Sequence, residues 1–150
     1  MSSPETAPRR LASGFGRLLV LLYIVFAVSA GFRAVYQVAT KFDQAPVSYS
    51  LSTLAAAIYL VAAVAIIRGA SRTAVAAVGV ELVGVVGVGA LSYAVPEWFP
   101  EASVWSHFGT GYGLVPLVLP VAGLVYLLRR RGGAASAEEA EAGDYEGGAA

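Results

Sequence analysis

Four long apolar stretches follow one another along the chain, separated by shorter segments that contain most of the charged residues. They cover about residues 16–38, 51–67, 73–95 and 113–128. A hydrocarbon core about 30 Å thick is crossed by roughly 20 helical residues, so each stretch can span a membrane, the last with tilt or local thinning. Backbone groups in lipid must satisfy their own hydrogen bonds, so the stretches should be helical despite their valines. The pattern predicts an all-α membrane protein, a bundle of four transmembrane helices with short loops.

The two ends of the chain lack this apolar character. Residues 1–14 are predicted to be an N-terminal cytoplasmic segment, residues 15–131 the transmembrane domain, and residues 132–150, rich in Gly, Ala and Glu, a disordered acidic cytoplasmic tail. Arg9 and Arg10, followed by an apolar run ending at Ala30, also resemble a signal peptide. The apolar run resumes after Arg33, which favours a span that is retained.

Composition and charge support a membrane location. Of 150 residues, 57% are hydrophobic and 13% charged, and the mean hydropathy of +0.69 is too high for a soluble domain of this size. Eight cations flank one side of the spans: Arg9, Arg10, Arg17, Arg68, Arg72, Arg129, Arg130 and Arg131. The positive-inside rule then predicts both termini on the cytoplasmic side of the cell membrane. We expect the lipid bilayer as a partner and no nucleic acid; the absence of cysteine excludes disulfides and thiolate chemistry.

Glu81 is the one acid within the four apolar stretches. It follows Arg72 by nine residues, which places it roughly 13 Å deep at about 1.5 Å per residue, near the middle of the membrane. A charge at this depth costs about 2.5 to 3.5 kcal/mol, so the side chain should face the bundle interior. It could be a proton or cation site used in transport, or a neutral acid hydrogen-bonded to a neighbouring helix. The absence of further acids or histidines in the spans favours the neutral acid.

The candidate partners of Glu81 are Arg33, Tyr59 and Tyr126. Arg33 belongs to a polar face that is expected to turn inward, together with Ser29, Tyr36, Gln37 and Thr40. Arg33 follows Arg17 by 16 residues and lies roughly 24 Å from the inner surface, against roughly 13 Å for Glu81. This difference in depth argues against a direct ion pair and favours a side chain that extends to the outer headgroups.

Small residues mark two faces of the stretch at residues 73–95. The face of Glu81 also carries Ala74, Ala77, Gly84, Val88 and Ser92. A second face carries Ala76, Gly79, Gly87, Ala90 and Ala94. Because small residues let helices approach closely in lipid, we expect this to be the central helix, with Gly79, Gly84, Gly87 and Ala90 as packing positions.

The connection before the last stretch, PEWFPEASVWSHFGTGY, holds most of the remaining chemical variety. Glu97, Glu101 and His107 could form a metal site but have no recognised ligand spacing, so we predict neither a metal nor a cofactor. Its aromatic residues are more typical of an interfacial belt on a half-submerged segment: Trp98, Phe99, Trp105 and Phe108. Pro116 and Pro120, four residues apart in the last stretch, predict a kink.

Several motifs together give a resemblance to a known family. The segments GRLLVLLYIVFAVSAGFRAVYQ, VGVELVGV, PEWFPEASVWSHFGTGYG and VPLVLPVAGL, the last followed by an arginine cluster, resemble a family of small four-span integral membrane proteins of actinobacteria. The resemblance covers about residues 15–131. It implies a four-span fold, and because the family has no assigned biochemical function it transfers no catalytic residue.

The function expected from these features is that of a membrane component without enzymatic activity. Residues that carry chemistry are few, with no catalytic residue predicted, whereas helix-packing surfaces are abundant. We therefore expect an accessory or assembly component of a membrane complex, bound to a membrane-protein partner or to copies of itself. The alternative is a small oligomeric transporter or channel subunit that uses the buried Glu81.

Overall fold

The computed structural model describes residues 14–147, and every regular element among them is helical, as predicted. The long helices are α1 (Gly14–Lys41), α2 (Pro46–Ile67), α3 (Ser71–Ala94) and α4 (Val115–Gly147). Three short 3-10 helices connect them: η1 (Phe42–Gln44), η2 (Pro96–Trp98) and η3 (Ser106–Tyr112). Residues 1–13 of the predicted N-terminal segment, which include Arg9 and Arg10, lie outside the described residues. Its last residue, Gly14, begins α1.

Three of the long helices can each cross a membrane. α1, α2 and α3 are long and apolar enough by themselves, whereas η3 and α4 qualify only as a pair that is bent by 101°. The described chain thus has three to four candidate spans, consistent with a multi-pass membrane protein. α2 begins at Pro46, earlier than the predicted span, because proline is favoured in the first turn of a helix.

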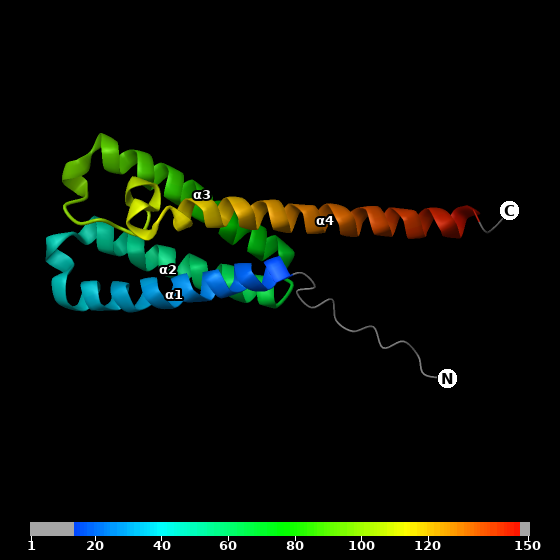
Figure 1. Cartoon of the computed structure of the whole chain (residues 1–150), viewed down its shortest axis with the longest axis horizontal. Helices are drawn as coiled ribbons and strands as arrows, with labels where there is room; N and C mark the ends of the chain where they lie inside the picture. The colour runs from blue at the N-terminus through cyan, green and yellow to red at the C-terminus, as the bar shows by residue number, and fades with distance from the viewer. Residues whose placement is uncertain (1–13, 148–150) are drawn as a thin grey trace.

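The helices pack in chain order (Figure 1). α1 and α2 lie side by side, α3 packs on α2, and α4 packs on α3 while touching α1 only lightly. The turn between α2 and α3 is tight and uses Gly69 at a φ of +69°, in the left-handed region that favours glycine. η3, yellow in Figure 1, folds back against α3, so the connection after α3 is part of the bundle.

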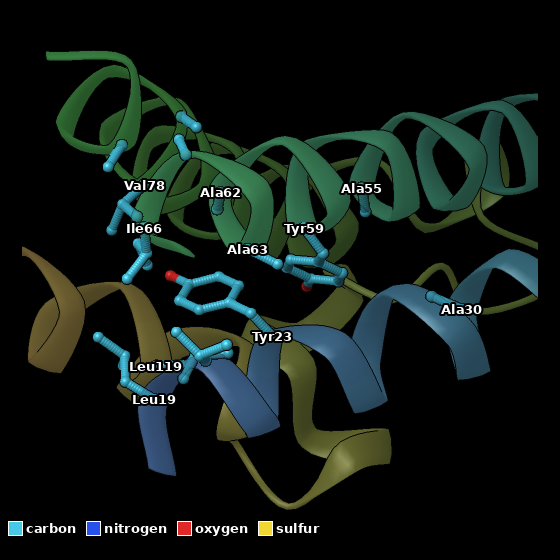
Figure 2. Packing of buried hydrophobic residues seen from close by; sticks show 14 of the residues in the cluster. Leu19, Tyr23, Ala30, Ala55, Tyr59, Ala62, Ala63, Ile66, Val78 and Leu119 are labelled. Atoms are coloured by element: carbon cyan, nitrogen blue, oxygen red, sulfur yellow. The ribbon is translucent and has the colours of Figure 1, made fainter. Parts of the chain in front are cut away.

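Alanine is the most frequent residue of the core, which surrounds two tyrosines. Tyr23 of α1 and Tyr59 of α2 are fully buried, and their ring centroids are 6.3 Å apart. Figure 2 shows both rings between the helices, with Ala62 and Ala63 beside them. Small side chains bring the helix backbones close together, which is how helices associate when lipid competes for apolar surface.

Large apolar side chains cover the outside of the helices. Phe32 is 77% exposed and Val83 is 74% exposed, and the other such residues are spread over α1, α2, α3 and the first half of α4. A soluble monomer rarely leaves so much contiguous apolar surface uncovered. The exterior therefore fits contact with lipid.

The fourth candidate span is interrupted before α4. Gly113 and Leu114 have φ angles of 64° and 62°, and α4 starts at Val115, part-way along the bundle (Figure 1). The chain thus bends at residues 113–114, ahead of the prolines. Pro116 lies in the first turn of α4, where its missing N–H removes no helical hydrogen bond, and the helix continues through Pro120.

The prediction of a disordered tail from residue 132 differs from the structure. α4 continues without a break to Gly147 and projects well beyond the bundle (Figure 1). The physical reason is that Ala and Glu are strong helix formers and that α4 has already nucleated the helix before the tail begins. A sequence with nothing to bury can therefore still be helical, and residues 132–144 are all exposed.

Candidate functional site

The site centres on a hydrogen bond between α1 and α3. Glu81 and Tyr23 are both 0% exposed, and the Tyr23 hydroxyl donates to Oε2 of Glu81 at 2.7 Å. Glu81 is thus buried inside the bundle, as its depth predicted. Tyr23 was not among the expected partners, although it follows Arg17 by six residues, roughly 9 Å, and so lies at a depth comparable to that of Glu81.

α4 closes the other side of this contact through a glycine. A Cβ atom placed on Gly123 would lie 3.3 Å from the Tyr23 hydroxyl and 3.3 Å from Cγ1 of Val78. Any larger side chain would press on the tyrosine. The absence of a side chain at residue 123 therefore lets α4 pack directly over the Tyr23–Glu81 pair.

Glu81 has no counter-charge in the described part of the chain. Within residues 14–147 its Oε1 atom has no hydrogen-bond partner, and no ion pair reaches it. The carboxyl group can therefore donate or accept one further hydrogen bond, and its single fixed contact is a neutral hydroxyl. This arrangement could hold α1, α3 and α4 in register, or could accept and release a proton.

A second buried hydrogen bond joins the connection after α3 to α2. Trp105 is 2% exposed, and its Nε1 donates to the Tyr59 hydroxyl at 3.1 Å. Gly84 of α3 makes the space: a Cβ there would lie 2.7 Å from the Trp105 ring. Tyr59 therefore lies in the same buried cluster as Glu81 but binds Trp105.

Serine hydroxyls anchor the rest of this connection to the helices. The N–H of Val104 donates to Oγ of Ser52 at 3.2 Å, and the N–H of His107 donates to Oγ of Ser92 at 2.8 Å. Irregular backbone inside the bundle is tolerated because its polar groups find protein partners. The expected aromatic belt is thus wrong for most of its members, since Phe99 and Trp105 are buried, Phe108 is half-buried and only Trp98 is exposed.

Arg33 and Tyr126 lie apart from Glu81. Arg33 is exposed and its Nη1 donates to the Tyr112 hydroxyl at 2.7 Å. Tyr126 is half-buried and its hydroxyl accepts from Nη1 of Arg130 at 3.3 Å. The expected inward polar face of α1 is reduced to Gln37, since its other members are all exposed: Ser29, Arg33, Tyr36 and Thr40.

The small residues of α3 divide into two groups. Ala74, Ala77 and Ser92 are buried on the Glu81 face, and Gly84, one of the four expected packing positions, packs on the Trp105 ring of the connection after α3. The second face is open within the chain: Gly87, Ala76, Ala90 and Ala94 are exposed, and a Cβ on Gly79 or Gly87 would meet nothing within 4 Å. α3 therefore contacts α2, η3 and α4 while its small-residue stripe faces outward.

The described residues contain no cluster of metal ligands. No group of three His, Asp or Glu side chains within residues 14–147 could hold a metal ion, so Glu97, Glu101 and His107 do not come together as a site. His107 packs edge-on against the Tyr93 ring, with centroids 4.7 Å apart. Its position is explained by this aromatic contact.

Comparison with known proteins gives no further assignment. A scan against protein-family models and searches of curated proteins and of solved structures found no match to the chain. The resemblance to a four-span actinobacterial family thus has no support from these comparisons.

We predict that Tyr23→Phe and Glu81→Leu each destabilise the protein and that the two effects are not additive. Each change removes the same interhelical hydrogen bond, which in membranes contributes on the order of 0.5 to 2 kcal/mol. Unfolding titrations of the purified protein in mixed micelles should therefore show a favourable coupling energy of this size. Tyr126→Phe is the control and should leave stability unchanged. Full additivity of the two changes would contradict the contact.

We also predict that Gly84→Ala is destabilising whereas Gly87→Ala is not. The new Cβ at residue 84 would overlap the buried Trp105 ring, an overpacking that costs about 1 to 3 kcal/mol. The new Cβ at residue 87 meets open space. Thermal melts monitored by tryptophan fluorescence check this, and equal melting temperatures for the two variants would show that Trp105 does not pack on α3.

Proposed function

We propose that this protein is a non-enzymatic component of a membrane complex, a four-span bundle in the cytoplasmic membrane that presents one face of α3 to another transmembrane helix. The observation that carries the proposal is the outward stripe of small residues on α3, with nothing within 4 Å of a Cβ on Gly79 or Gly87. Val83, which lies between them at four-residue spacing, is 74% exposed. Transmembrane helices associate most closely through such small residues.

The rest of the bundle leaves this face of α3 accessible to a partner helix. α3 is already fixed from behind by the Glu81–Tyr23 bond and by Trp105, so a partner would meet a rigid surface. A preformed surface loses less conformational entropy on binding than a mobile one. This supports an assembly role.

The helical extension of α4 supports the same role. Beyond Arg131 it continues for several turns outside the bundle, with Glu138, Glu139 and Glu141 exposed along it (Figure 1). Such an acidic helix offers a partner protein a second binding surface on the aqueous side of the membrane. Two contacts on one chain raise the effective concentration of the second once the first has formed.

A specific observation favours a second candidate function. Among the described residues Oε1 of Glu81 has no hydrogen-bond partner, and the fourth candidate span is interrupted. Broken helices at membrane depth often line transport sites. A small oligomeric transporter or channel subunit would use this acid. Four helices enclose little space, so this function needs several copies of the chain around a common path.

We predict that the bundle has both ends in the cytoplasm. The arginine-rich ends of the helices support this orientation. In intact cells a membrane-impermeant maleimide should label Asp43→Cys and Ala102→Cys, whereas Ala70→Cys and Ser136→Cys should react only after permeabilisation. All four positions are exposed, and the chain has no native cysteine to interfere. The reverse labelling pattern would contradict this orientation.

We predict that Gly87→Leu releases the partner without unfolding the bundle. The leucine would stand on the outward face, where its Cβ meets no described atom within 4 Å and its bulk prevents close helix approach. Co-purification in mild detergent, with the mass of the complex measured by light scattering, should show a stoichiometric partner for the wild type and for Ala57→Leu, an exposed small residue of α2. The partner should be lost in Gly87→Leu.

The same measurement separates the two candidate functions. A complex with a different protein supports the assembly role, and a homo-oligomer that dissociates in Gly87→Leu supports the transporter or channel role. A wild type that is monomeric, or a complex that Gly87→Leu leaves intact, contradicts the use of this face of α3.

A further inference from the structure

A polar cavity of about 360 Å³ lies where α1 ends, apart from the Glu81 cluster. Three of its lining residues come from one face of α1 at four-residue spacing: Arg33, Gln37 and Lys41. Tyr49 of α2 and Glu101 of the connection after α3 line it as well. The end of α1, the start of α2 and the distant connection after α3 thus contribute polar groups to one cavity of a size that suits a small ligand.

One side chain in this cavity is buried with an oxygen that has no hydrogen-bond partner. Gln37 is only 8% exposed, and its Oε1 atom has no partner among the described residues. Tyr49 lines the same cavity and is 1% exposed as a residue. Because nearly all buried polar groups in proteins are hydrogen-bonded, the Gln37 oxygen points to a ligand that supplies the missing partner.

The charges around the cavity have both signs. Arg33 is held in place by the Tyr112 hydroxyl at 2.7 Å and by the Tyr112 ring, 5.7 Å from its guanidinium carbon, and it keeps further N–H groups for a ligand. Lys41 adds a second cation, with Nζ 6.0 Å from the centre of the Tyr36 ring. Glu101 contributes a carboxylate, an acceptor like the Gln37 oxygen. The lining therefore suits a ligand that carries an anionic group for the two cations and a hydrogen-bond donor for the two oxygen acceptors.

We propose that this cavity binds a zwitterionic group in which a primary ammonium is joined to a phosphate or carboxylate. The anion lies against Arg33 and Lys41, and the ammonium donates to Gln37 and Glu101. The Tyr49 hydroxyl donates to the anion. Two sources present this chemistry: the headgroup of phosphatidylethanolamine, and a free zwitterion such as O-phosphoethanolamine.

The test uses the purified full-length protein and both sources. Retention of lipid is measured by native mass spectrometry after exchange into nanodiscs of phosphatidylethanolamine, phosphatidylcholine or phosphatidylglycerol. Binding of O-phosphoethanolamine is measured by calorimetry. We expect at least one phosphatidylethanolamine per chain to be retained in preference to the other two lipids if the source is lipid, and heat from O-phosphoethanolamine if it is a free zwitterion.

Variants assign the binding to this cavity. Lys41→Gln and Gln37→Leu should each weaken binding at least tenfold, while Lys41→Arg, which keeps the charge, should retain it. Arg68→Gln, an exposed cation at the other end of α2, is the matched control and should bind as the wild type does. Equal retention of phosphatidylglycerol, no binding of either source, or wild-type affinity in both Lys41→Gln and Gln37→Leu would overturn the proposal.

Discussion

The hydrogen bond from Tyr23 to Glu81 is the contact on which the rest of the bundle depends. It joins the first helix to the third across the whole core, and Gly123 lets the fourth helix pack over it. A carboxyl group at the middle of an apolar bundle is costly unless it is bonded, so the helices cannot shift along one another without exposing it to lipid or leaving it unpaired. One polar contact thereby sets the relative depth of three helices whose apolar surfaces alone would allow sliding.

The connection after α3 is the second contact that fixes the helices relative to one another, and it needs the space above Gly84. Trp105 enters the core over Gly84 and reaches Tyr59, whose ring packs beside Tyr23. The backbone that carries the tryptophan cannot be regular, so its N–H groups bond to serine hydroxyls of the surrounding helices. The inserted segment also explains why the fourth candidate span is bent: α4 can begin only where the chain has turned out of the core.

Much of this could be predicted from the sequence, and the failures have physical causes. Hydropathy marks the apolar helices, and depth alone indicates that Glu81 is buried, because lipid imposes both. Tyr23 could not be predicted as the partner of Glu81 because a single tyrosine in an apolar run gives no periodic signal. The polar face of α1, by contrast, includes Arg33. The inserted loop was missed because its aromatic residues suit either the interface or the core, and only the gap at Gly84 decides between them. The helical tail was missed because low hydrophobicity excludes a core but does not exclude a helix.

We infer that Glu81 is a neutral acid bonded to Tyr23, and its Oε1 has no partner among the described residues. Infrared difference spectroscopy of the membrane-embedded protein measures this directly, by subtracting the spectrum of Glu81→Gln from that of the wild type. We expect the carbonyl stretch of a protonated carboxylic acid, shifted to higher frequency in Tyr23→Phe because the hydrogen bond to the carboxyl group is lost. Carboxylate bands in place of that carbonyl stretch, or a carbonyl stretch that Tyr23→Phe leaves unmoved, would contradict it.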